Sequence, residues 1–349
     1  MSGLFRGGVG GDLPPTRYQG SKARLAPLLR EVFSSLSFAS AIDLFSGTAS
    51  VGLLLKSLGK RVHSNDALRA NAIIARALVA NEATTLGLDD ARELYERRPG
   101  TTYDDLIART FAGVFFLDEE NAWLDVVARN IADAAPGPAQ ALAYYALFQA
   151  CLKKRPFNLF HRKNLDLRLR DVPRSFGNKH TWETAFPAHF EEALADANDA
   201  VFASGLAHTV TNEDALSLEA SADLVYIDPP YMNGRGQSVD YLDHYHFLEG
   251  LTELDAWPER IDRSRPHLPY RSPPSPWRKQ KDISAAFASL LERHRDSILV
   301  VSYRADGIPT EAELAGMLER LGKRVRVLRA DQRYALSTRP THELVFVAE

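Results

Sequence analysis

Two kinds of hydrophobic pattern alternate along the first quarter of the chain. Residues 22–36 place apolar side chains three and four positions apart, which predicts a helix. Residues 41–45 form a short apolar run typical of a buried strand, and residues 46–59 form a turn of small residues that leads into a second helix. A further strand is expected at 60–64, with a helix from about 67 to 86. This repeated strand–helix order predicts a parallel, doubly wound α/β sheet.

The rest of the chain carries a long helical region and then returns to strands. Residues 88–150 and 180–204 have mostly helical patterns. Residues 323–328 and 344–348 alternate or run apolar, which suggests an antiparallel pair that closes the sheet. Further buried strands are expected at 207–210, 224–227 and 298–302.

The composition is that of a folded protein without a strong overall charge. The chain has 349 residues, 45% hydrophobic and 25% charged, enough for one large α/β domain with insertions or for two domains. Its net charge of −3 gives no support for a nucleic-acid partner, so such a partner must bind a local patch. No stretch approaches 18 uninterrupted apolar residues, and Cys151 is the single cysteine. We therefore expect a cytoplasmic protein without a membrane span or disulfide, and a loose Gly/Pro-rich arm at 1–16.

Local positive charge gathers in two segments. Residues 153–175 contain eight Lys or Arg residues against two acidic residues, mixed with aromatic and Asn side chains. Residues 258–281 are rich in Pro and Arg with little periodicity, which predicts a long loop. Each segment could bind the phosphates of a nucleic acid, or the first could be a solvated face and the second a mobile loop.

The turn after the first predicted strand has the features of a cofactor site. In DLFSGTASVG, Asp43 ends the strand and Gly47 lies in the turn, where a small residue lets the backbone approach a ligand. Asp66 ends the next strand, where an acid can accept hydrogen bonds from both hydroxyls of a ribose. These residues predict a nucleotide-like cofactor, although an ordinary strand–helix turn with a solvated Asp has the same local pattern.

The same turn argues against a dinucleotide. A dinucleotide site would need the spacing G-x-G-x-x-G, whereas only Gly47 stands before Ala49 here. Asp43 would also repel a pyrophosphate, and it suits a cofactor with a cationic amine. S-adenosylmethionine combines such an amine with a sulfonium, a ribose and an adenine, so it is the predicted cofactor.

The sequence DLVYIDPPYMNGRG ends a buried strand with an acid, two prolines and a tyrosine. Asp228 lies at the carboxyl end of this strand, where ligands bind in open α/β sheets. Pro229 and Pro230 have fixed φ angles and lack backbone donors, so the local carbonyls remain as rigidly held acceptors. Tyr231 offers a flat face for stacking. We therefore expect a flat base whose exocyclic amine donates to Asp228 and the Pro229 carbonyl, which directs the nitrogen lone pair toward an electrophile.

These motifs and their order resemble those of the Dam-like, α-class DNA adenine-N6 methyltransferases that use S-adenosylmethionine. The resemblance covers most of the chain and begins with RYQGSKARLAPLL at 17–29. It implies a Rossmann-like methyltransferase fold: a mostly parallel seven-stranded sheet with an antiparallel closing hairpin, and an inserted, mainly helical target-recognition region. It places the catalytic domain at 17–150 and 200–349, and the recognition insert at 151–199.

The resemblance also implies roles for individual cofactor residues. Tyr18 and Lys22 would approach the cofactor, with Lys22 near its carboxylate, and Phe45 would pack on it. Asp43 would take the amine and Asp66 the ribose.

Two positions match the family pattern less closely than the others. Asp214, in TNEDAL, would meet the cofactor adenine, although Glu213 is adjacent and either acid could serve. Ala49 stands where many family members have a second glycine, which could narrow the cofactor pocket.

Methylation of an amino group inside a duplex requires the base to be flipped out. Phosphate contacts hold the duplex and base contacts choose the site, and the segment KKRPFNLFHRKNLDLR offers side chains of both types. Phe157 and Phe160 are expected to anchor this segment in the core. Asn158, His161 and Asn164 could read base edges or fill the gap left by the flipped base. Phosphate contacts are expected from Lys153, Lys154, Arg155, Arg162 and Lys163, with 258–281 as a possible DNA clamp.

The predicted function is site-specific methyl transfer to the N6-amino group of adenine in double-stranded DNA. An RNA-base or cytosine-N4 methyltransferase, and a catalytically silent DNA-binding subunit, are the alternatives. A metal is not expected, because methyl transfer to an amine needs none and the His244–Tyr245–His246 run lacks a clear ligand set. We expect a monomer, for which a partner endonuclease is possible.

Overall fold

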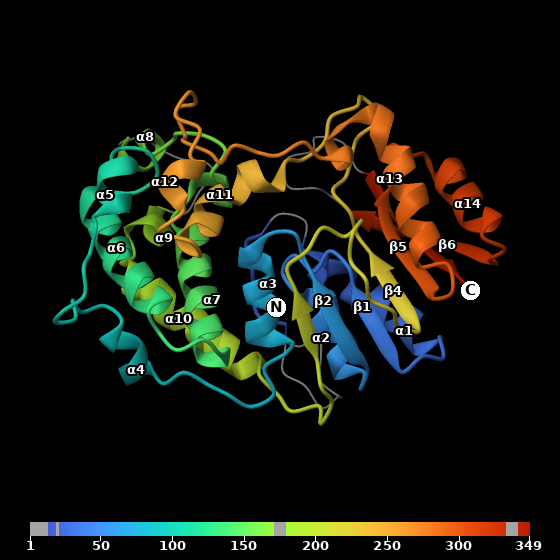
Figure 1. The fold of residues 1–349 in the computed structure, drawn as a ribbon, viewed down its shortest axis with the longest axis horizontal. Helices are drawn as coiled ribbons and strands as arrows, with labels where there is room; N and C mark the ends of the chain where they lie inside the picture. Colours follow the sequence, from blue (N-terminus) through green and yellow to red (C-terminus); the bar gives the residue numbers. More distant parts are fainter. Residues whose placement is uncertain (1–12, 19–20, 171–178, 333–340) are drawn as a thin grey trace.

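The computed structural model describes residues 13–18, 21–170, 179–332 and 341–349, apart from the side chains of 331, 332 and 341. A twisted sheet flanked by helices forms one side of the molecule, and a body of helices forms the other (Figure 1). Most of the predicted 1–16 arm and part of the predicted recognition insert lie outside the described residues.

The described chain forms one seven-stranded sheet with the order β3-β2-β1-β4-β5-β7-β6. Strands β1 to β5 pair in parallel, whereas β7 is antiparallel to both β5 and β6. This arrangement confirms the predicted fold class, including the closing antiparallel pair. The strands are β1 (Ser40–Asp43), β2 (Arg61–Asn65), β3 (Thr209–Thr211), β4 (Leu224–Ile227), β5 (Ile298–Arg304), β6 (Val325–Gln332) and β7 (Thr341–Ala348).

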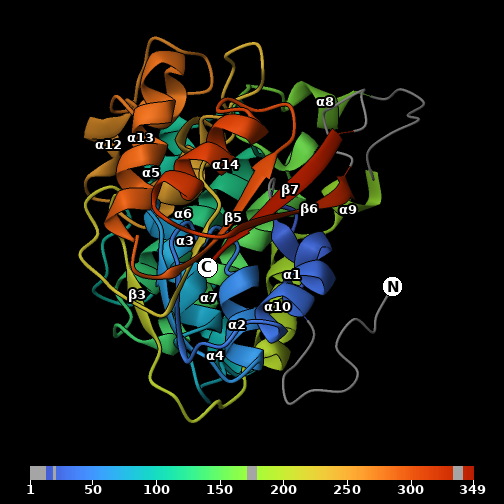
Figure 2. The ribbon, with the colours of Figure 1, turned by 90° about the vertical axis from the view of Figure 1, so that its right-hand side faces the viewer.

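Successive side chains of the central strands enter two different hydrophobic cores, because side chains alternate between the faces of a sheet. In β1, Ala41 packs with one core and Ile42 with the other; in β4, Tyr226 and Val225 divide in the same way. Helices α1, α2 and α3 cover the first face, and α13 and α14 cover the second (Figure 2). These helices are α1 (Ala26–Ser34), α2 (Ser50–Ser57), α3 (Arg69–Leu78), α13 (Gln280–Arg293) and α14 (Glu311–Arg320), with a short 3-10 helix η1 (Lys22–Leu25) before α1.

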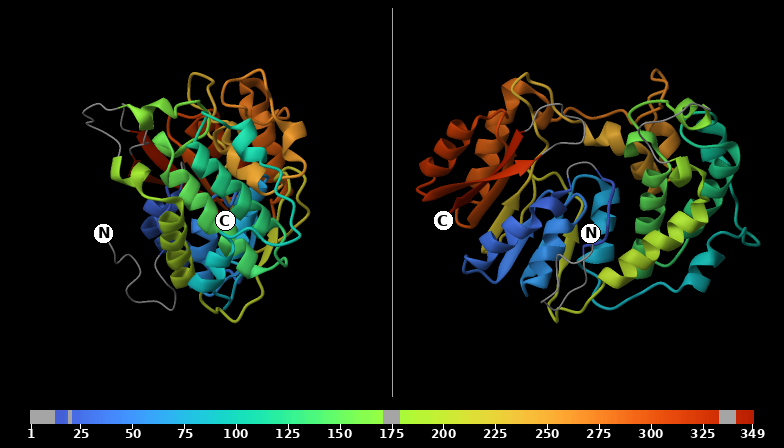
Figure 3. Two further views of the ribbon diagram at one scale, coloured as in Figure 1. Left: turned by 90° about the vertical axis from the view of Figure 1, so that its left-hand side faces the viewer. Right: turned by 180° about the vertical axis from the view of Figure 1, so that it is seen from behind.

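The helical body is inserted mainly between α3 and β3, and Figure 3 shows it from behind, beside the sheet. Its central helix α7 is apolar on all sides, and residues 141–152 are all buried, as expected for a helix surrounded by protein. The body begins at α4, so the predicted insert at 151–199 corresponds only to its C-terminal part. Its helices are α4 (Leu88–Glu93), α5 (Leu106–Thr110), α6 (Asp118–Ala132), α7 (Pro138–Lys153), α8 (Asp166–Leu169), α9 (Lys179–Glu183) and α10 (Phe186–Ala200), with the 3-10 turn η2 (Pro156–Asn158).

The connection between β4 and β5 joins the helical body to the sheet. It contains α11 (Tyr241–Leu251), α12 (Trp257–Arg260) and the 3-10 turn η3 (Pro276–Arg278). Glu249 of α11 accepts hydrogen bonds from the Arg69 and Ala70 amides at 2.9 and 3.0 Å, which satisfies the free amides at the start of α3. The segment 258–281, which was predicted to be a long loop, includes the end of α12, the turn η3 and the start of α13.

Candidate active site

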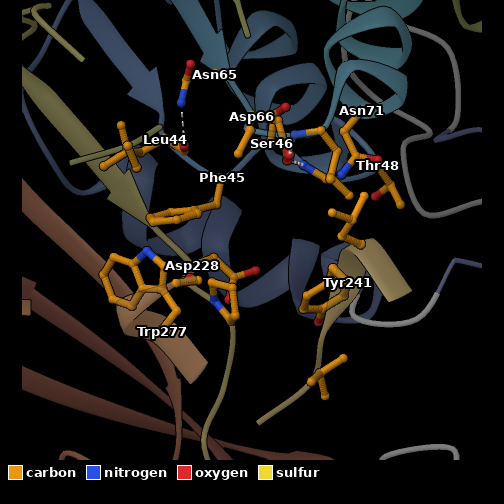
Figure 4. A pocket seen from close by; sticks show the side chains of 18 of the residues that line it. Leu44, Phe45, Ser46, Thr48, Asn65, Asp66, Asn71, Asp228, Tyr241 and Trp277 are labelled. Atoms are coloured by element: carbon orange, nitrogen blue, oxygen red, sulfur yellow. Dashed lines mark hydrogen bonds between the residues drawn. The ribbon is translucent and has the colours of Figure 1, made fainter. Parts of the chain in front are cut away.

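A cavity of about 300 Å³ lies at the carboxyl ends of β1, β2 and β4, within the size range of small-molecule sites. The chain runs outward from β1 to β2 and β3 and then returns to β4 on the opposite side of β1. Ligands of open α/β sheets bind at such a reversal of strand order. Asp43, Asp66 and Asp228 all line this one cavity, so the structure brings the acids of the three motifs together. Figure 4 shows Asp66 and Asp228 among the lining side chains.

Asp43 is held by the start of α2. Its Oδ2 accepts a hydrogen bond from the Gly52 amide at 2.9 Å, and a Cβ at Gly52 would lie 3.0 Å from the Ser64 Oγ. Glycine therefore fits this position, where α2 crosses close to β2, and a larger residue would require the Ser64 and Val79 side chains to shift. Burial, and then repulsion from Asp228, raise the pKa of Asp43 to about 8. A cationic group placed beside this carboxyl would reverse that shift.

Asp66 organises the turn that follows β1. Its Oδ2 accepts the Gly47 amide at 2.8 Å and its Oδ1 accepts the Leu68 amide at 2.9 Å. Gly47 has a φ of +50°, a left-handed conformation that glycine adopts without steric cost. Burial raises the pKa of Asp66, while these amide donors oppose the shift. A carboxylate can accept about four hydrogen bonds, so acceptor sites remain for further donors.

Ala49 affects the turn through its backbone. It is fully buried with a φ of 59° and is not among the residues that line the cavity. The expected narrowing of the pocket is therefore wrong. The Ala49 backbone is instead strained, because a left-handed conformation costs a residue with a Cβ about 1–2 kcal/mol.

Several buried acceptor atoms around the cavity have no hydrogen-bond partner among the described residues. They are Asp43 Oδ1, Ser46 Oγ and Asn71 Oδ1. Unsatisfied buried polar atoms are costly in a folded protein, so their clustering indicates a ligand that brings donors. An ammonium and ribose hydroxyls are such donors, and the residues present therefore fit S-adenosylmethionine.

Two aromatic rings form one end of the cavity (Figure 4). Phe45 and Trp277 meet edge to face with centroids 5.5 Å apart, and Trp277 is fixed from behind by Phe287 at 5.4 Å. Nothing in the sequence around Trp277 indicated this role, because the residue lies more than 200 positions from Phe45. Of the two acids considered near the adenine, Asp214 lines the cavity and Glu213 does not.

The segment that carries Trp277 is fastened over the cavity. Arg278 forms an ion pair with Asp240, and the Ser272 hydroxyl donates to the same carboxylate at 3.2 Å. All three residues line the cavity. The end of the 258–281 segment thus forms a wall of the site. This role was not part of its predicted function as a DNA clamp.

Tyr18 lies in a stack of aromatic rings on the side of the cavity nearest α11. Its ring is 3.8 Å from that of Tyr245, and its hydroxyl accepts a hydrogen bond from Asn71 Nδ2 at 3.1 Å. Tyr241 lies 6.2 Å beyond Tyr18 and also lines the cavity (Figure 4). The structure therefore offers a second aromatic surface opposite the Phe45 end.

Asp228 belongs to a buried cluster of four polar side chains. The Lys22 ammonium lies 2.6 Å from Asp228 Oδ2, and the Tyr231 hydroxyl lies 2.7 Å from Asp228 Oδ1. The fourth member is Glu343 of β7, which is fully buried, lies within hydrogen-bond distance of the same Tyr231 hydroxyl and lies 3.5 Å from the Lys22 ammonium. Nothing in the sequence around Glu343 indicated that this acid reaches Asp228, because the two residues lie more than 100 positions apart.

The charged side chains of this cluster shift one another's pKa values. Burial lowers the pKa of Lys22, but Asp228 and Glu343 together raise it well above its usual value, so the ammonium stays charged. Burial raises the pKa of Asp228, Lys22 opposes that shift and Glu343 adds to it, with a net rise. Asp228 is therefore a better proton acceptor than an exposed Asp.

Of the three residues that follow Asp228, only Pro230 lines the cavity. Pro229 is buried beside it. Tyr231 is not among the cavity-lining residues: its ring packs edge-on against Tyr303 at 5.2 Å, and its hydroxyl points to Asp228. The open aromatic face that we expected from Tyr231 is instead offered by Tyr241.

The comparison with known families decides the identity of this site. The model of the D12 class N6 adenine-specific DNA methyltransferases matches residues 18–253, more than half of the chain. The chain belongs to this family. It is an adenine-specific DNA methyltransferase, so the RNA-base, cytosine and silent-subunit alternatives are not supported.

Related methyltransferases differ in how much of their length this chain spans. It is 28% identical to the Type II methyltransferase M2.HphI of Haemophilus parahaemolyticus, over 96% of this chain and 98% of that protein. It is 24% identical to M.NlaIII of Neisseria lactamica over 88% of each chain. The 25% identity to M.FokI of Planomicrobium okeanokoites covers 88% of this chain but 47% of that larger protein.

The methyltransferase buries two of the five cations that were expected to contact phosphates. The Lys154 ammonium, 2% exposed, donates to the Trp182 carbonyl at 2.6 Å and pairs with Glu120 at 2.6 Å. Arg155, 1% exposed, donates to the backbone carbonyls of residues 115, 159 and 162 and to Asn164. Lys154, Arg155 and the buried Asn164 are therefore structural, and their assignment to DNA was wrong because buried groups cannot reach a phosphate or a base edge.

The remaining residues of this segment are more accessible. Arg162 and Lys163 are exposed and Asn158 and His161 are partly exposed, while Lys153 pairs with Glu192 at 2.8 Å. Phe160 is fully buried as expected, but the expectation that Phe157 anchors the core was wrong, because its side chain is 49% exposed.

The arginines of the second basic segment are largely paired within the protein. Arg260 lies 3.0 Å from Glu253, and Arg265 lies 2.6 Å from Asp243. Arg271, Lys279 and Lys281 are exposed. The charge that this segment can offer to DNA is therefore smaller than its sequence indicates.

No group of three or more His, Cys, Asp or Glu side chains in the described part of the chain could hold a metal ion, and burial lowers the pKa of His246 to about 3. Within the same residues, none of the helices has the length and apolar character needed to span a bilayer.

Proposed function

We propose that this methyltransferase transfers a methyl group from S-adenosylmethionine to the N6 nitrogen of an adenine flipped out of double-stranded DNA. One observation carries the proposal: Asp228 lines the same cavity as Asp43 and Asp66. The acid suited to a base amine and the acids suited to a cofactor thus face one enclosed space.

The cofactor roles follow from the chemistry of the cavity wall. Asp43 suits the amine because its carboxyl is buried, has one unpartnered oxygen in the described structure and gains from a neighbouring cation. Asp66 suits the ribose hydroxyls, and Phe45 with Trp277 suits the adenine, with Asp214 at its edge. When bound, S-adenosylmethionine supplies an electrophilic methyl group on a sulfonium.

Lys22 has a different neighbour from the one expected. We expected it near the cofactor carboxylate, but its ammonium lies 2.6 Å from Asp228 and it also lines the cavity. Its proposed role is to hold the Asp228 side chain in one orientation. Tyr18 supports the wall through its stacking on Tyr245.

The target amine is positioned by acceptors. Asp228 and the Pro229 carbonyl accept the two N6–H bonds, which turns the nitrogen lone pair away from the ring. Pro229 and Pro230 keep this part of the backbone rigid, so the main catalytic contribution is positioning. Tyr241 lines the cavity, and the Tyr231 hydroxyl contacts Asp228.

DNA is held by the accessible part of the basic segment. Arg162 and Lys163 contact phosphates, with Lys153 as a further candidate, while Asn158 and His161 face base edges or the gap in the duplex. These contacts offset the few kcal/mol that base flipping costs. The part of the helical body at 151–199 is thus the proposed recognition region.

The biological setting is that of a modification enzyme. The relatives are named Type II methyltransferases, and we propose that this chain modifies a short DNA sequence in a restriction–modification context. We propose a monomer that acts in the cytoplasm.

Incubation with labelled S-adenosylmethionine and DNA, followed by digestion to nucleosides, tests the proposal. The expected product is N6-methyldeoxyadenosine, with transfer lost in Asp228→Ala and DNA binding retained. Label in cytidine, in RNA or nowhere would overturn the substrate assignment. Sustained turnover by Asp228→Ala would overturn the role of that residue.

A further inference from the structure

Glu343 is a buried acid that the methyl-transfer geometry does not use. It lies on β7, opposite Arg304 of β5 and Ala330 of β6, and its side chain is fully buried. It nevertheless reaches the active site, because the Tyr231 hydroxyl contacts both Glu343 Oε1 and Asp228 Oδ1. Glu343 also lies 3.5 Å from the Lys22 ammonium, so it shares the cation that contacts Asp228.

The oxygens of Asp228, Tyr231 and Glu343 form a chain with two contacts. The tyrosine has one hydroxyl proton, so it can donate to only one of the two carboxylates at a time. The second contact is satisfied only when one carboxyl group carries a proton, because two oxygens without a hydrogen between them repel. The chain therefore has room for one further proton.

The reaction releases such a proton. The N6 nitrogen forms a bond to the methyl carbon, the electron pair of the broken carbon–sulfur bond stays on sulfur, and one N–H bond of the amine must then break. Asp228 is the acid proposed to contact this amine. The Lys22 ammonium lies beside both carboxylates and stays charged.

We propose that Glu343 is a positioning residue that makes Asp228 the acceptor of the proton released from N6, through the Tyr231 hydroxyl. The inference rests on the proposed function of Asp228. In the starting state Tyr231 donates to Glu343 and Asp228 is free to accept. When the N6 proton moves to Asp228, Asp228 donates to Tyr231 and Tyr231 continues to donate to Glu343, so both contacts of the chain are filled.

The electrostatics of the cluster agree with this assignment. Glu343 lies close enough to raise the pKa of Asp228, in addition to the effect of burial. Without this second carboxylate, Lys22 alone would hold Asp228 in its ionised form and make it a poorer acceptor. The Lys22 ammonium lies 2.6 Å from Asp228 and 3.5 Å from Glu343. It therefore interacts more strongly with Asp228, whose carboxylate it orients.

Two variants separate this role from a structural one. Glu343→Gln keeps the size of the side chain and removes its charge, and Tyr231→Phe removes the bridging hydroxyl. Tyr303→Phe is the matched control, because its hydroxyl donates to the Ile308 carbonyl and its ring touches Tyr231, but it stands outside the chain of oxygens.

Single-turnover methylation measured against pH is the kinetic test. Both variants should slow the plateau rate by about 10–100-fold, and the double variant should be no slower than the slower single variant, since both interrupt one chain. The acidic limb should move to lower pH in Glu343→Gln and stay in place in Tyr303→Phe. Additive losses or an unmoved limb in Glu343→Gln would overturn the proposal.

A titration of the cofactor-free protein provides a second readout. With ¹³C-labelled aspartate, the Asp228 carboxyl should titrate at lower pH in Glu343→Gln than in the unaltered protein. An unchanged midpoint would refute the coupling even if activity fell. Should the unaltered protein fail to methylate N6 at all, the proposed function would fail, and this titration would still decide whether Glu343 acts on Asp228.

Discussion

The Lys22 ammonium lies 2.6 Å from Asp228 Oδ2 and 3.5 Å from Glu343 Oε1, in a region where the Lys22 side chain is 8% exposed. Lys22→Gln should remove the cation shared by two buried carboxylates and lower the free energy of unfolding by about 3–5 kcal/mol. Denaturant unfolding measures this loss. Arg295→Gln is the control, because Arg295 pairs with Glu292 at the surface and should change stability by less than about 0.5 kcal/mol. Equal effects of the two changes would contradict a buried ion pair.

Cofactor binding should release a proton from Asp43. The pKa of this carboxyl is raised to about 8 in the free protein, so below pH 8 it is mostly neutral, whereas a bound ammonium favours the ionised form. Affinity for S-adenosylmethionine should therefore rise up to about tenfold per pH unit between pH 6 and 8. Calorimetry in two buffers of different ionisation enthalpy counts the proton. Asp43→Asn should release none, and a pH-independent affinity in the unaltered protein would refute the role of Asp43.

The same raised pKa should make the cofactor-free protein less stable as pH rises. The folded state holds the Asp43 proton that an unfolded chain loses near pH 4, so the folded state binds more protons between pH 4 and 8. The stabilisation from this group is complete below pH 4 and is lost as pH approaches 8. Asp43→Asn should flatten this part of the stability profile, which thermal unfolding across pH would show.

Trp277 should report on cofactor binding. Among the four tryptophans it alone lines the cavity, so S-adenosylmethionine should change the fluorescence of the unaltered protein but not that of Trp277→Phe. Trp277→Ala should weaken cofactor binding by about 5–10-fold, the value of an aromatic contact. Trp123→Phe is the control, because Trp123 packs on Phe186 in the helical body. A fluorescence change that survives in Trp277→Phe would place the cofactor elsewhere.

Ala49→Gly should stabilise the protein. Ala49 has a φ of 59°, so glycine would relieve about 1–2 kcal/mol of strain, offset by roughly 0.4–1 kcal/mol from a more flexible unfolded chain. A net gain of about 0.5–1 kcal/mol in the free energy of unfolding is expected. Ala197→Gly, in the regular helix α10, should instead lose about 1 kcal/mol. The two changes should therefore have opposite signs.

The cations of the basic segment at 153–175 should fall into two functional groups. Arg162→Ala and Lys163→Ala should each weaken DNA binding uniformly across sequences and reduce the slope of log affinity against log salt by about 1. Arg155→Ala should instead lower stability, because its buried guanidinium supports several backbone carbonyls. Anisotropy titrations with labelled duplex at several salt concentrations separate these outcomes. An unchanged salt slope in the Arg162 and Lys163 variants would move the DNA interface away from this segment.

Local patterns determined the sheet and the acids at its edge. Apolar runs and helical spacings along the sequence predicted the order of the strands and helices. The runs of the central strands are apolar throughout because their side chains alternate between two hydrophobic cores. Asp43, Asp66 and Asp228 were brought together by one rule, that the carboxyl ends of parallel strands meet at the same edge. The positions of these acids along the chain were therefore enough to predict that they share a cavity.

Only the tertiary structure decided which charges are buried and which distant side chains complete the site. Lys154 and Arg155 look like Lys163 in sequence, yet the first two satisfy carbonyls inside the helical body. Trp277 and Glu343 reach the cavity and its acid from segments far from the motifs they serve. A sequence pattern records the spacing of neighbours along the chain, whereas burial and pairing depend on contacts between segments that only folding brings together.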